Sequence, residues 1–376
     1  MCFSSILQLQ HDHDYQHTSR EGRVVDTFDK LLAEHEEFRD LMHEHKVAVE
    51  VMDDHMKKIS KGQVFALEYI KENEKLFAFY TGLPSYQVFT MLFQYLRTKA
   101  EDMQYISQYG HSHHADKFHS KPGKARMLSL EEEMFLTLVR LRLGLPSKDL
   151  SHRFGIAEST FSNIFNTWVI LIAQELEKIC SMPPTDLTLE NQAPCFDSFS
   201  NVRIVLDCTE VFAQTPGSLQ NHRQIFSNYK HHSTVKFLVG MSPSGAIIYI
   251  SDMWGGRASD KKITQESTDL LNALDAGNKV MVDRGFTIAE DLPPGVQLII
   301  PPFKDKKTGQ FTARQLEYSE KISVARIHVE RAMRAIKEFR ILESEVRMSC
   351  IDNFCNIFKA CAFLVNFKTP FLKVRP

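Results

Sequence analysis

A short apolar run that ends in an acid, residues 202–210, constrains the fold of this chain most. Ile204, Val205 and Leu206 are β-branched or apolar, which is typical of a strand covered on both faces of a sheet. Asp207 follows directly. Because carboxylates are disfavoured inside strands, we expect the strand to end there and Asp207 to lie at its end. Taken alone, such an acid is more often a turn former or one half of an ion pair.

Two more acids follow comparable elements further along the chain. Asp283 ends a second apolar strand, residues 279–283, and Glu330 lies in a basic helical stretch. Three carboxylates on three elements are what a two-metal nuclease needs, since two Mg²⁺ ions about 3.5–4 Å apart activate a nucleophile and neutralise the scissile phosphate. We expect Asp207 to bridge two Mg²⁺ (or Mn²⁺) ions, Asp283 to hold one and Glu330 the other. The alternative for Glu330 is a salt-bridged surface helix.

Basic residues accompany these acids. Glu330 shares one helix face with Arg326, Arg334 and Lys337, at spacings of three or four. Arg326 and Arg334 could pair with Glu330 and still face DNA phosphates. A Gly-rich loop leads into a helix that begins at Asp260, and could either seat a phosphate or be a tight turn. Asp260 is either a first-turn helix acid or a low-ranked fourth metal ligand. The predicted DNA-binding residues here are Lys230, Arg257, Arg326, Arg334 and Lys337.

The charge is divided unevenly along the chain. The 376 residues carry a net charge of −2, but residues 201–376 hold 24 lysines and arginines against 18 acids. A basic half that also holds the three acids fits a polyanionic substrate, although ordinary surface variation could give the same excess. The length and the 43% hydrophobic content allow two or three domains, one with a substantial core.

The seven cysteines form no C-x-x-C pair and no zinc-finger spacing, which favours reduced, intracellular thiols. The N-terminus has no signal-peptide pattern, and no apolar run has the length of a membrane span, so we expect no membrane partner. A DNA-cleaving protein would act in the nucleus, with the cytoplasm as a second location.

The first third of the chain reads as helix and linker. We expect residues 1–23 to be disordered. Residues 24–62 should form a coiled-coil-like helix, because apolar residues and two histidines alternate by three and four over residues 28–59. This seam predicts a homo-oligomer, or else a single amphipathic helix packed on its own protein. Residues 63–126 are predicted to be a helical region followed by a linker. Gly82 should end one helix of this region, and Pro84 and Ser85 should start the next. The four histidines of the linker could bind a metal or be solvated.

Residues 127–180 read as three helices arranged as a helix-turn-helix. Ser129 and Ser147 could cap the first two helices, Gly155 supplies a turn, and the third begins at about Glu158. Its outward polar residues could contact DNA; the predicted ones are Ser159, Thr160 and Asn163. The same pattern also suits a plain three-helix bundle. Residues 181–200 are rich in Pro and Ser and are predicted to be a linker.

Residues 201–370 are predicted to be one α/β domain with a mixed sheet and helices packed on it. The strands are expected at 202–207, 234–241, 246–252, 279–283 and 297–301. Helices should run from Asp260 to about Leu274 and from about Thr312 to Ile341.

At these residues the chain resembles the DDE-superfamily endonucleases of the Harbinger-like transposases, over roughly residues 128–368. The resemblance rests on LDCTE, WGGRASD, VDRGF and RIHVERAMRAIKEFRIL, preceded by the helix-turn-helix stretch LPSKDLSHRFGIAESTFSNIFNTW. Cys208 stands where these proteins commonly have Gly, and Val282 and Phe286 also depart from their motif.

The resemblance implies a ribonuclease-H-like fold, a catalytic set of Asp207, Asp283 and Glu330, two divalent metal ions and cleavage of double-stranded DNA. Relatives often carry a zinc-binding DNA domain near the N-terminus, and no such Cys/His pattern occurs here, so a separate DNA-binding partner protein could supply target recognition. The rival hypothesis is a domesticated DNA-binding or scaffold protein without nuclease activity. A weaker one is a nuclease acting on RNA or another polynucleotide.

Overall fold

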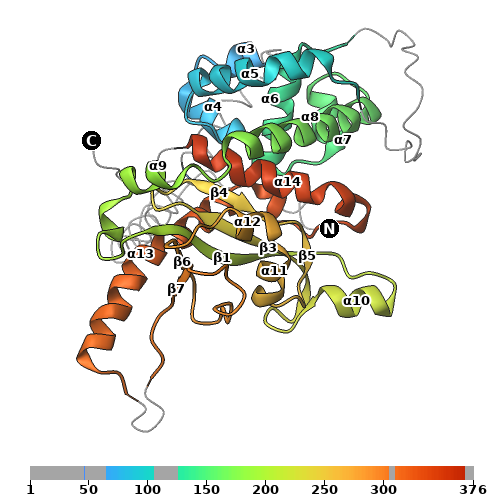
Figure 1. Ribbon diagram of the computed structural model, residues 1–376. Helices are drawn as coiled ribbons and strands as arrows, with labels where there is room; N and C mark the ends of the chain where they lie inside the picture. Colours follow the sequence, from blue (N-terminus) through green and yellow to red (C-terminus); the bar gives the residue numbers. More distant parts are fainter. Residues whose placement is uncertain (1–45, 47–64, 106–125, 305–309, 369–376) are drawn as a thin grey trace, which may run out of the picture. The chain divides into compact units, whose positions relative to one another are not determined.

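The computed structural model describes Lys46 and residues 65–105, 126–304 and 310–368 (Figure 1). The predicted disordered segment 1–23 lies outside these residues. So do the coiled-coil-like helix 24–62, apart from Lys46, and the histidines of the linker. Within the described parts, no helix is both long and apolar enough to cross a membrane.

The helical region begins with three helices, α3 (Leu67–Ile70), α4 (Glu74–Thr81) and α5 (Tyr86–Asp102). Gly82 ends α4 in the left-handed conformation, with φ of 75°, and Ser85 caps α5 by accepting from the Val88 N–H. The sequence predicted this break from the same glycine and serine.

The predicted three helices of residues 127–180 are α6 (Leu130–Leu143), α7 (Ser147–Arg153) and α8 (Glu158–Ile179). Ser129 caps α6 as predicted, in a capping box with Glu132. The predicted cap at Ser147 is wrong, because Pro146 occupies the N-cap position and Ser147 is already helical.

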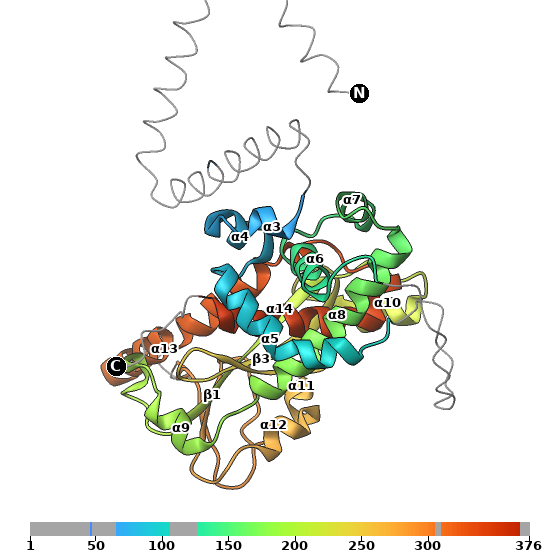
Figure 2. The same ribbon diagram turned by 90° about the horizontal axis from the view of Figure 1, so that it is seen from above.

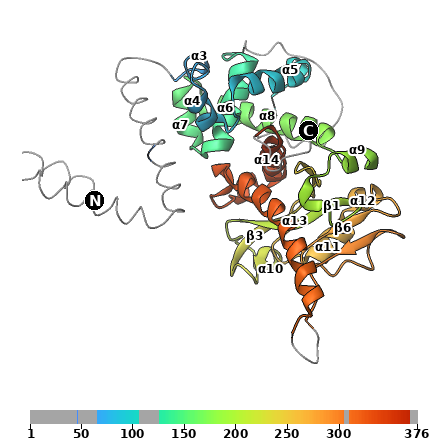
Figure 3. The same ribbon diagram turned by 90° about the vertical axis from the view of Figure 1, so that its left-hand side faces the viewer.

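Helix α14 (Ile351–Leu364) joins the helical region to the sheet. Figures 1 and 3 show it between α8 and the strands, and Figure 2 shows α8 close to it from above. Two polar contacts tie α8 to α14, Asn353 Nδ2 to Asn166 Oδ1 at 3.1 Å and Lys359 Nζ to Glu177 Oε1 at 2.8 Å. On the sheet side, the Phe358 ring stacks on that of Phe237 with centroids 3.9 Å apart. The helix-turn-helix and the α/β part therefore share core packing.

The sheet contains seven strands, β1 (Val202–Phe212), β2 (Phe226–Ser227), β3 (His232–Met241), β4 (Ile247–Ile250), β5 (Trp254–Gly255), β6 (Lys279–Met281) and β7 (Gln297–Ile299). The main order is β4-β3-β1-β6-β7, with β2 and β5 paired to the first half of β3. The pairs β1–β3 and β3–β4 are antiparallel, whereas β6 runs parallel to β1 and β7 parallel to β6. This mixed sheet confirms the predicted ribonuclease-H-like α/β domain after an all-helical region.

Helices cover both faces of the sheet (Figure 3). On one face α11 (Asp260–Glu266) and α12 (Thr268–Asn272) pack Ile263 and Leu270 against Ile204 and Leu206 of β1. The predicted single helix 260–274 is broken at Ser267, which leaves helical geometry with ψ of 62°. The other face carries α13 (Ala313–Lys337) and α14.

The remaining elements are short. They are α9 (Thr185–Glu190), α10 (Leu219–Ile225) and the 3-10 turns η1 (Pro194–Phe196), η2 (Arg340–Leu342), η3 (Met348–Cys350) and η4 (Val365–Phe367). The predicted linker 181–200 thus contains α9 and η1, and Phe196 and Phe199 are buried.

Candidate active site

Asp207 lies in the middle of β1 rather than at its end, so the expected end of the strand was wrong. The strand continues to Phe212 because β3 remains paired with it as far as Thr234. The parallel neighbour β6 stops earlier, where Met281 pairs with Val205. Asp207 therefore lies just beyond the end of β6, while β3 is still paired with β1 on the other side. The side chain of Asp207 is only partly buried.

Asp283 reaches the same level of the sheet from β6. It lies two residues beyond Met281, as Asp207 lies two residues beyond Val205, and those two residues are register partners in parallel strands. Because strand side chains alternate with a period of two, both carboxylates belong to the same face. Val282 and Phe286 are buried on either side of Asp283, whose own side chain is 52% exposed.

Arg326 of α13 forms an ion pair with Asp283 and interacts electrostatically with Asp207. Its Nη1 donates to Asp283 Oδ1 at 3.0 Å, and its side chain is only 13% exposed. Burial raises the pKa of Asp207 to about 6, against the opposing effects of Arg326 and of the Cys208 N–H, which donates to Asp207 Oδ1 at 2.9 Å. The negative charges of Asp283 and Asp260 add to the rise. The guanidinium is thus the main local compensation for two neighbouring carboxylates.

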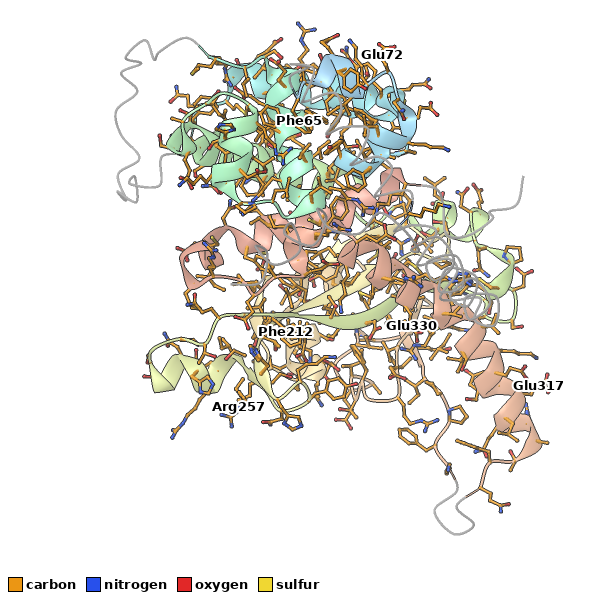
Figure 4. All side chains as sticks on the ribbon, turned by 180° about the vertical axis from the view of Figure 1, so that it is seen from behind. Phe65, Glu72, Phe212, Arg257, Glu317 and Glu330 are labelled. Carbon is orange, nitrogen blue, oxygen red and sulfur yellow. The ribbon has the colours of Figure 1, made fainter. Side chains whose placement is uncertain are left out.

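Glu330 lies one helical turn after Arg326 and is exposed. Figure 4 shows it on the part of α13 that passes the sheet, whereas Glu317 lies on the part that extends beyond it. In the described structure, the Glu330 side chain makes no hydrogen bond or ion pair, so the predicted pairing with Arg326 is wrong. Arg326 turns to Asp283 instead, because that contact compensates two acids.

The donor set fits a divalent cation in part. Asp207 and Asp283 supply hard carboxylate oxygens at one level of the sheet, and Mg²⁺ accepts few protein ligands and keeps waters or phosphate oxygens in its other positions. Among the residues that the structure describes, however, no three His, Cys, Asp or Glu side chains are close enough together to hold a metal ion.

Asp260 belongs to a second polar group on the opposite face of β1. It is the first residue of α11, behind the Ser259 cap, and forms an ion pair with Lys236 Nζ at 2.6 Å. Lys236 also lies 3.9 Å from Glu210 Oε1, and the Cys208 thiol is hydrogen-bonded to Asp260. Burial, then Asp260, strongly raise the pKa of that thiol. These contacts favour a structural role for Asp260.

The glycines of the Gly-rich loop, Gly255 and Gly256, allow neighbouring segments to pack closely against the loop. A Cβ on Gly256 would lie 1.9 Å from Thr234 Oγ1, and one on Gly255 would lie 2.4 Å from the Gln224 carbonyl oxygen. Both glycines are therefore required by the packing of β5 against β3 and α10. Arg257 follows them and is exposed (Figure 4).

Three of the remaining predicted basic residues, Lys230, Arg334 and Lys337, lie on the turn before β3 and on α13. The pKa of Lys337 is lowered by burial and then by the charge of Lys230, while Glu210 and Asp207 raise it. Lys337 is therefore close enough to Lys230 and to the acids of β1 to interact electrostatically with them. Arg334 is exposed one turn before Lys337 on α13.

The predicted DNA-contacting residues of α8 lie in its first two turns. Ser159 is exposed, and Thr160 and Asn163 are partly buried. Further along the same helix, Asn166 is bonded to α14. Of these residues, Ser159 is the most accessible to a DNA partner.

Sequence reasoning missed Glu210 and the role of Lys236. Glu210 is three residues from Asp207 and so lies on the other face of the strand, where it pairs across β3 with Lys236. The sequence signal is the opposite charge of the two residues, which becomes informative only once the register of β1 and β3 is known.

Comparison with known proteins supports this architecture. Residues 206–366 match the family model described as DDE superfamily endonuclease, and residues 126–178 match the helix-turn-helix of DDE superfamily endonuclease. No curated protein matches the chain. Together the two models cover more than half of the sequence, and they do not distinguish a Harbinger-like subtype. The chain thus belongs to the DDE superfamily endonucleases, with the helix-turn-helix of that superfamily ahead of its nuclease domain.

Proposed function

We propose that this protein is a metal-dependent DNA endonuclease of transposase type, with Asp207, Asp283 and Glu330 as its catalytic acids. The observation that carries the proposal is the placement of Asp207 and Asp283 at one level of adjacent parallel strands, with Glu330 on the helix that lies against β1. The family match supports a nuclease of this kind.

Each residue has a role that follows from its position. Divalent ions, Mg²⁺ or Mn²⁺, would supply an activated nucleophile and charge neutralisation at the scissile phosphate. Asp207, the most enclosed of the three acids, would bridge two ions, while Asp283 and Glu330 would each hold one. Arg326 must then leave Asp283 or share it, and a displaced guanidinium would be well placed to bind a phosphate oxygen.

Cleavage of supercoiled plasmid in Mg²⁺ or Mn²⁺ tests the proposal. We expect the wild-type protein to nick the plasmid, and Asp283→Asn to reduce the rate by at least about a hundredfold, because the amide cannot replace an ionised metal ligand. Asp252→Asn is the matched control, since Asp252 is 89% exposed and lies outside the group of acids.

Nicking that persists in Asp283→Asn would contradict the assignment of the site. If wild type and variant are equally inert while both bind DNA, the rival function gains support, namely a transposase-derived DNA-binding or scaffold protein. The observation that favours this rival is the Arg326–Asp283 ion pair, which occupies a predicted metal ligand. Adding nuclear extract to the inert protein would reveal whether a separate DNA-binding partner is required.

A nuclear location goes with a DNA substrate, and fluorescence microscopy of the tagged full-length chain tests it. Tag signal excluded from the nucleus would contradict this part of the proposal. The predicted homo-oligomer through residues 28–59 belongs to the same proposal and is tested by the mass of the full chain in solution.

A further inference from the structure

Exposed aromatic side chains lie at the far end of β1 and the start of β3, and the proposed cleavage chemistry does not use them. Tyr229 is 80% exposed, and Phe212, the last residue of β1, is 45% exposed. The His232 ring meets that of Phe212 edge-on, with centroids 5.2 Å apart. Figure 4 shows Phe212 at this end of the strand. Large aromatics presented together on a surface mark an interaction site more often than a single exposed one does.

The chain holds Tyr229 in a defined position. It belongs to the turn 228–231 between β2 and β3, where Ser227 pairs with His232. The Lys230 N–H donates to Ser227 Oγ at 3.2 Å, and His231 has a positive φ of 51°. The turn is thus anchored to the sheet that also carries Asp207, and the ring is presented by a fixed element.

Cationic groups connect this aromatic surface with the acids. Lys230 Nζ lies 4.9 Å from the centroid of the Tyr229 ring. Lys337 of α13 interacts electrostatically with Lys230 and with Glu210 and Asp207. Lys337 and Lys230 are therefore two cations near the acids that the phosphates of a bound backbone can contact, and the Tyr229 ring lies beside Lys230.

We propose that Phe212, Tyr229 and Lys230 form a binding site for unpaired nucleotides of the DNA substrate, in which a base stacks on Tyr229 and the backbone phosphates contact Lys230 and Lys337. Aromatic rings beside cations suit single strands, because an unpaired base offers its face while a paired base offers only its edge. The inference deepens the proposed function and rests on it. It names the substrate as duplex DNA with a frayed or single-stranded stretch beside the cut.

The test compares two fluorescein-labelled DNAs, a blunt duplex and the same duplex with a five-nucleotide single-stranded overhang. Binding is measured by fluorescence anisotropy in EDTA, so that no cleavage occurs. We expect the wild type to prefer the overhang DNA by about tenfold. Tyr229→Ala should lose this preference while its affinity for the blunt duplex stays unchanged, and Tyr229→Phe should keep it, because stacking does not need the hydroxyl.

Tyr95→Ala is the matched control, since Tyr95 is an exposed tyrosine on α5, in the helical region. Equal affinity of the wild type for both DNAs, an unchanged preference in Tyr229→Ala, or no binding at all overturns the inference. Because the assay contains no metal ion, its result is separate from nicking. A lost preference in a protein that never nicks supports the binding site and refutes the proposed nuclease. A protein that nicks the plasmid but shows no overhang preference supports the proposed nuclease and refutes the binding site.

Discussion

At the residue scale, Asp207 is the acid of the candidate site whose pKa the fold raises. Its pKa of about 6 is raised above the usual value near 4, chiefly by burial, so the folded protein binds this proton more tightly than the unfolded chain does. The stability contributed by protonated Asp207 is therefore full at low pH and is lost as the pH rises from about 4 to about 6.

Asp207→Asn should remove this pH-dependent loss of stability. We expect the variant to gain about 2 kcal/mol relative to wild type between pH 4.5 and pH 7, because the amide cannot ionise in the enclosed position. Urea unfolding in EDTA at several pH values measures the difference. If the free energy of unfolding changes with pH in the same way for both proteins across this range, the prediction is wrong. Asp252→Asn is the control at an exposed position.

Arg326 competes with a cation for the same acids. Replacing it by Gln removes the guanidinium from Asp283 and leaves the charge of two carboxylates uncompensated. We expect Arg326→Gln to bind Mn²⁺ about fivefold more tightly, or about 1 kcal/mol, in calorimetric titrations. Lys321→Gln on the same helix is the control, since Lys321 pairs with Glu317 away from the site. Weaker Mn²⁺ binding by Arg326→Gln would show that the arginine supports the cation site.

At the scale of elements, a buried carboxylate holds the helical region together. Glu133 of α6 is fully buried and accepts hydrogen bonds from Trp168 Nε1 at 2.8 Å, from Arg126 Nη1 at 2.9 Å and from the Tyr105 hydroxyl. The donors come from three different segments of the chain. In sequence, Glu133 looked like its neighbours Glu131 and Glu132, as an acid near a helix N-terminus.

Glu133→Gln should therefore destabilise the protein by about 2–4 kcal/mol, because one amide cannot accept from all three donors and the Arg126 charge loses its partner. Thermal unfolding followed by circular dichroism measures the change. Glu132→Gln is the comparison, since replacing this partly exposed capping-box residue should cost about 1 kcal/mol or less. Equal effects of the two substitutions would refute a special role for Glu133.

The sequence predicted the features that depend on residues close together in the chain. Ser129 and Gly82 mark real helix ends, and the apolar runs of β1, β3 and β6 mark real strands, because caps, turns and burial act over a few residues. Asp207 was placed at a strand end because the sequence does not show that β3 extends beyond β6. For the same reason, the Arg326–Asp283 contact, between residues 43 positions apart, could not be foreseen. The acids of the candidate site were thus identifiable, but their ion-pair partners depend on strand register.

At the scale of the whole molecule, the helix-turn-helix is built into the core of the nuclease unit. Its last helix, α8, packs along α14, whose Phe358 stacks on Phe237 of the sheet. At the other end of the region, Gly144 approaches the backbone of Arg340 so closely that a Cβ would lie 3.0 Å from its carbonyl oxygen. The start of α8 is therefore held at a fixed distance from Asp207. Under the proposed function, this distance sets how far apart the DNA contacts and the cleavage can be.

This shared core predicts that the two regions unfold together. The chain has only two tryptophans, Trp168 in α8 and Trp254 in β5, so Trp254→Phe leaves a fluorescence signal from the helical region alone. In that background, Phe237→Leu in the sheet should lower the urea midpoint seen by Trp168, because it loosens the stack on α14. Val324→Ala, at a 52% exposed position of α13, should leave the midpoint unchanged. If Phe237→Leu lowers the midpoint measured by circular dichroism but leaves the midpoint measured by Trp168 fluorescence unchanged, the helix-turn-helix folds on its own. Its distance from the acids would then be free to vary.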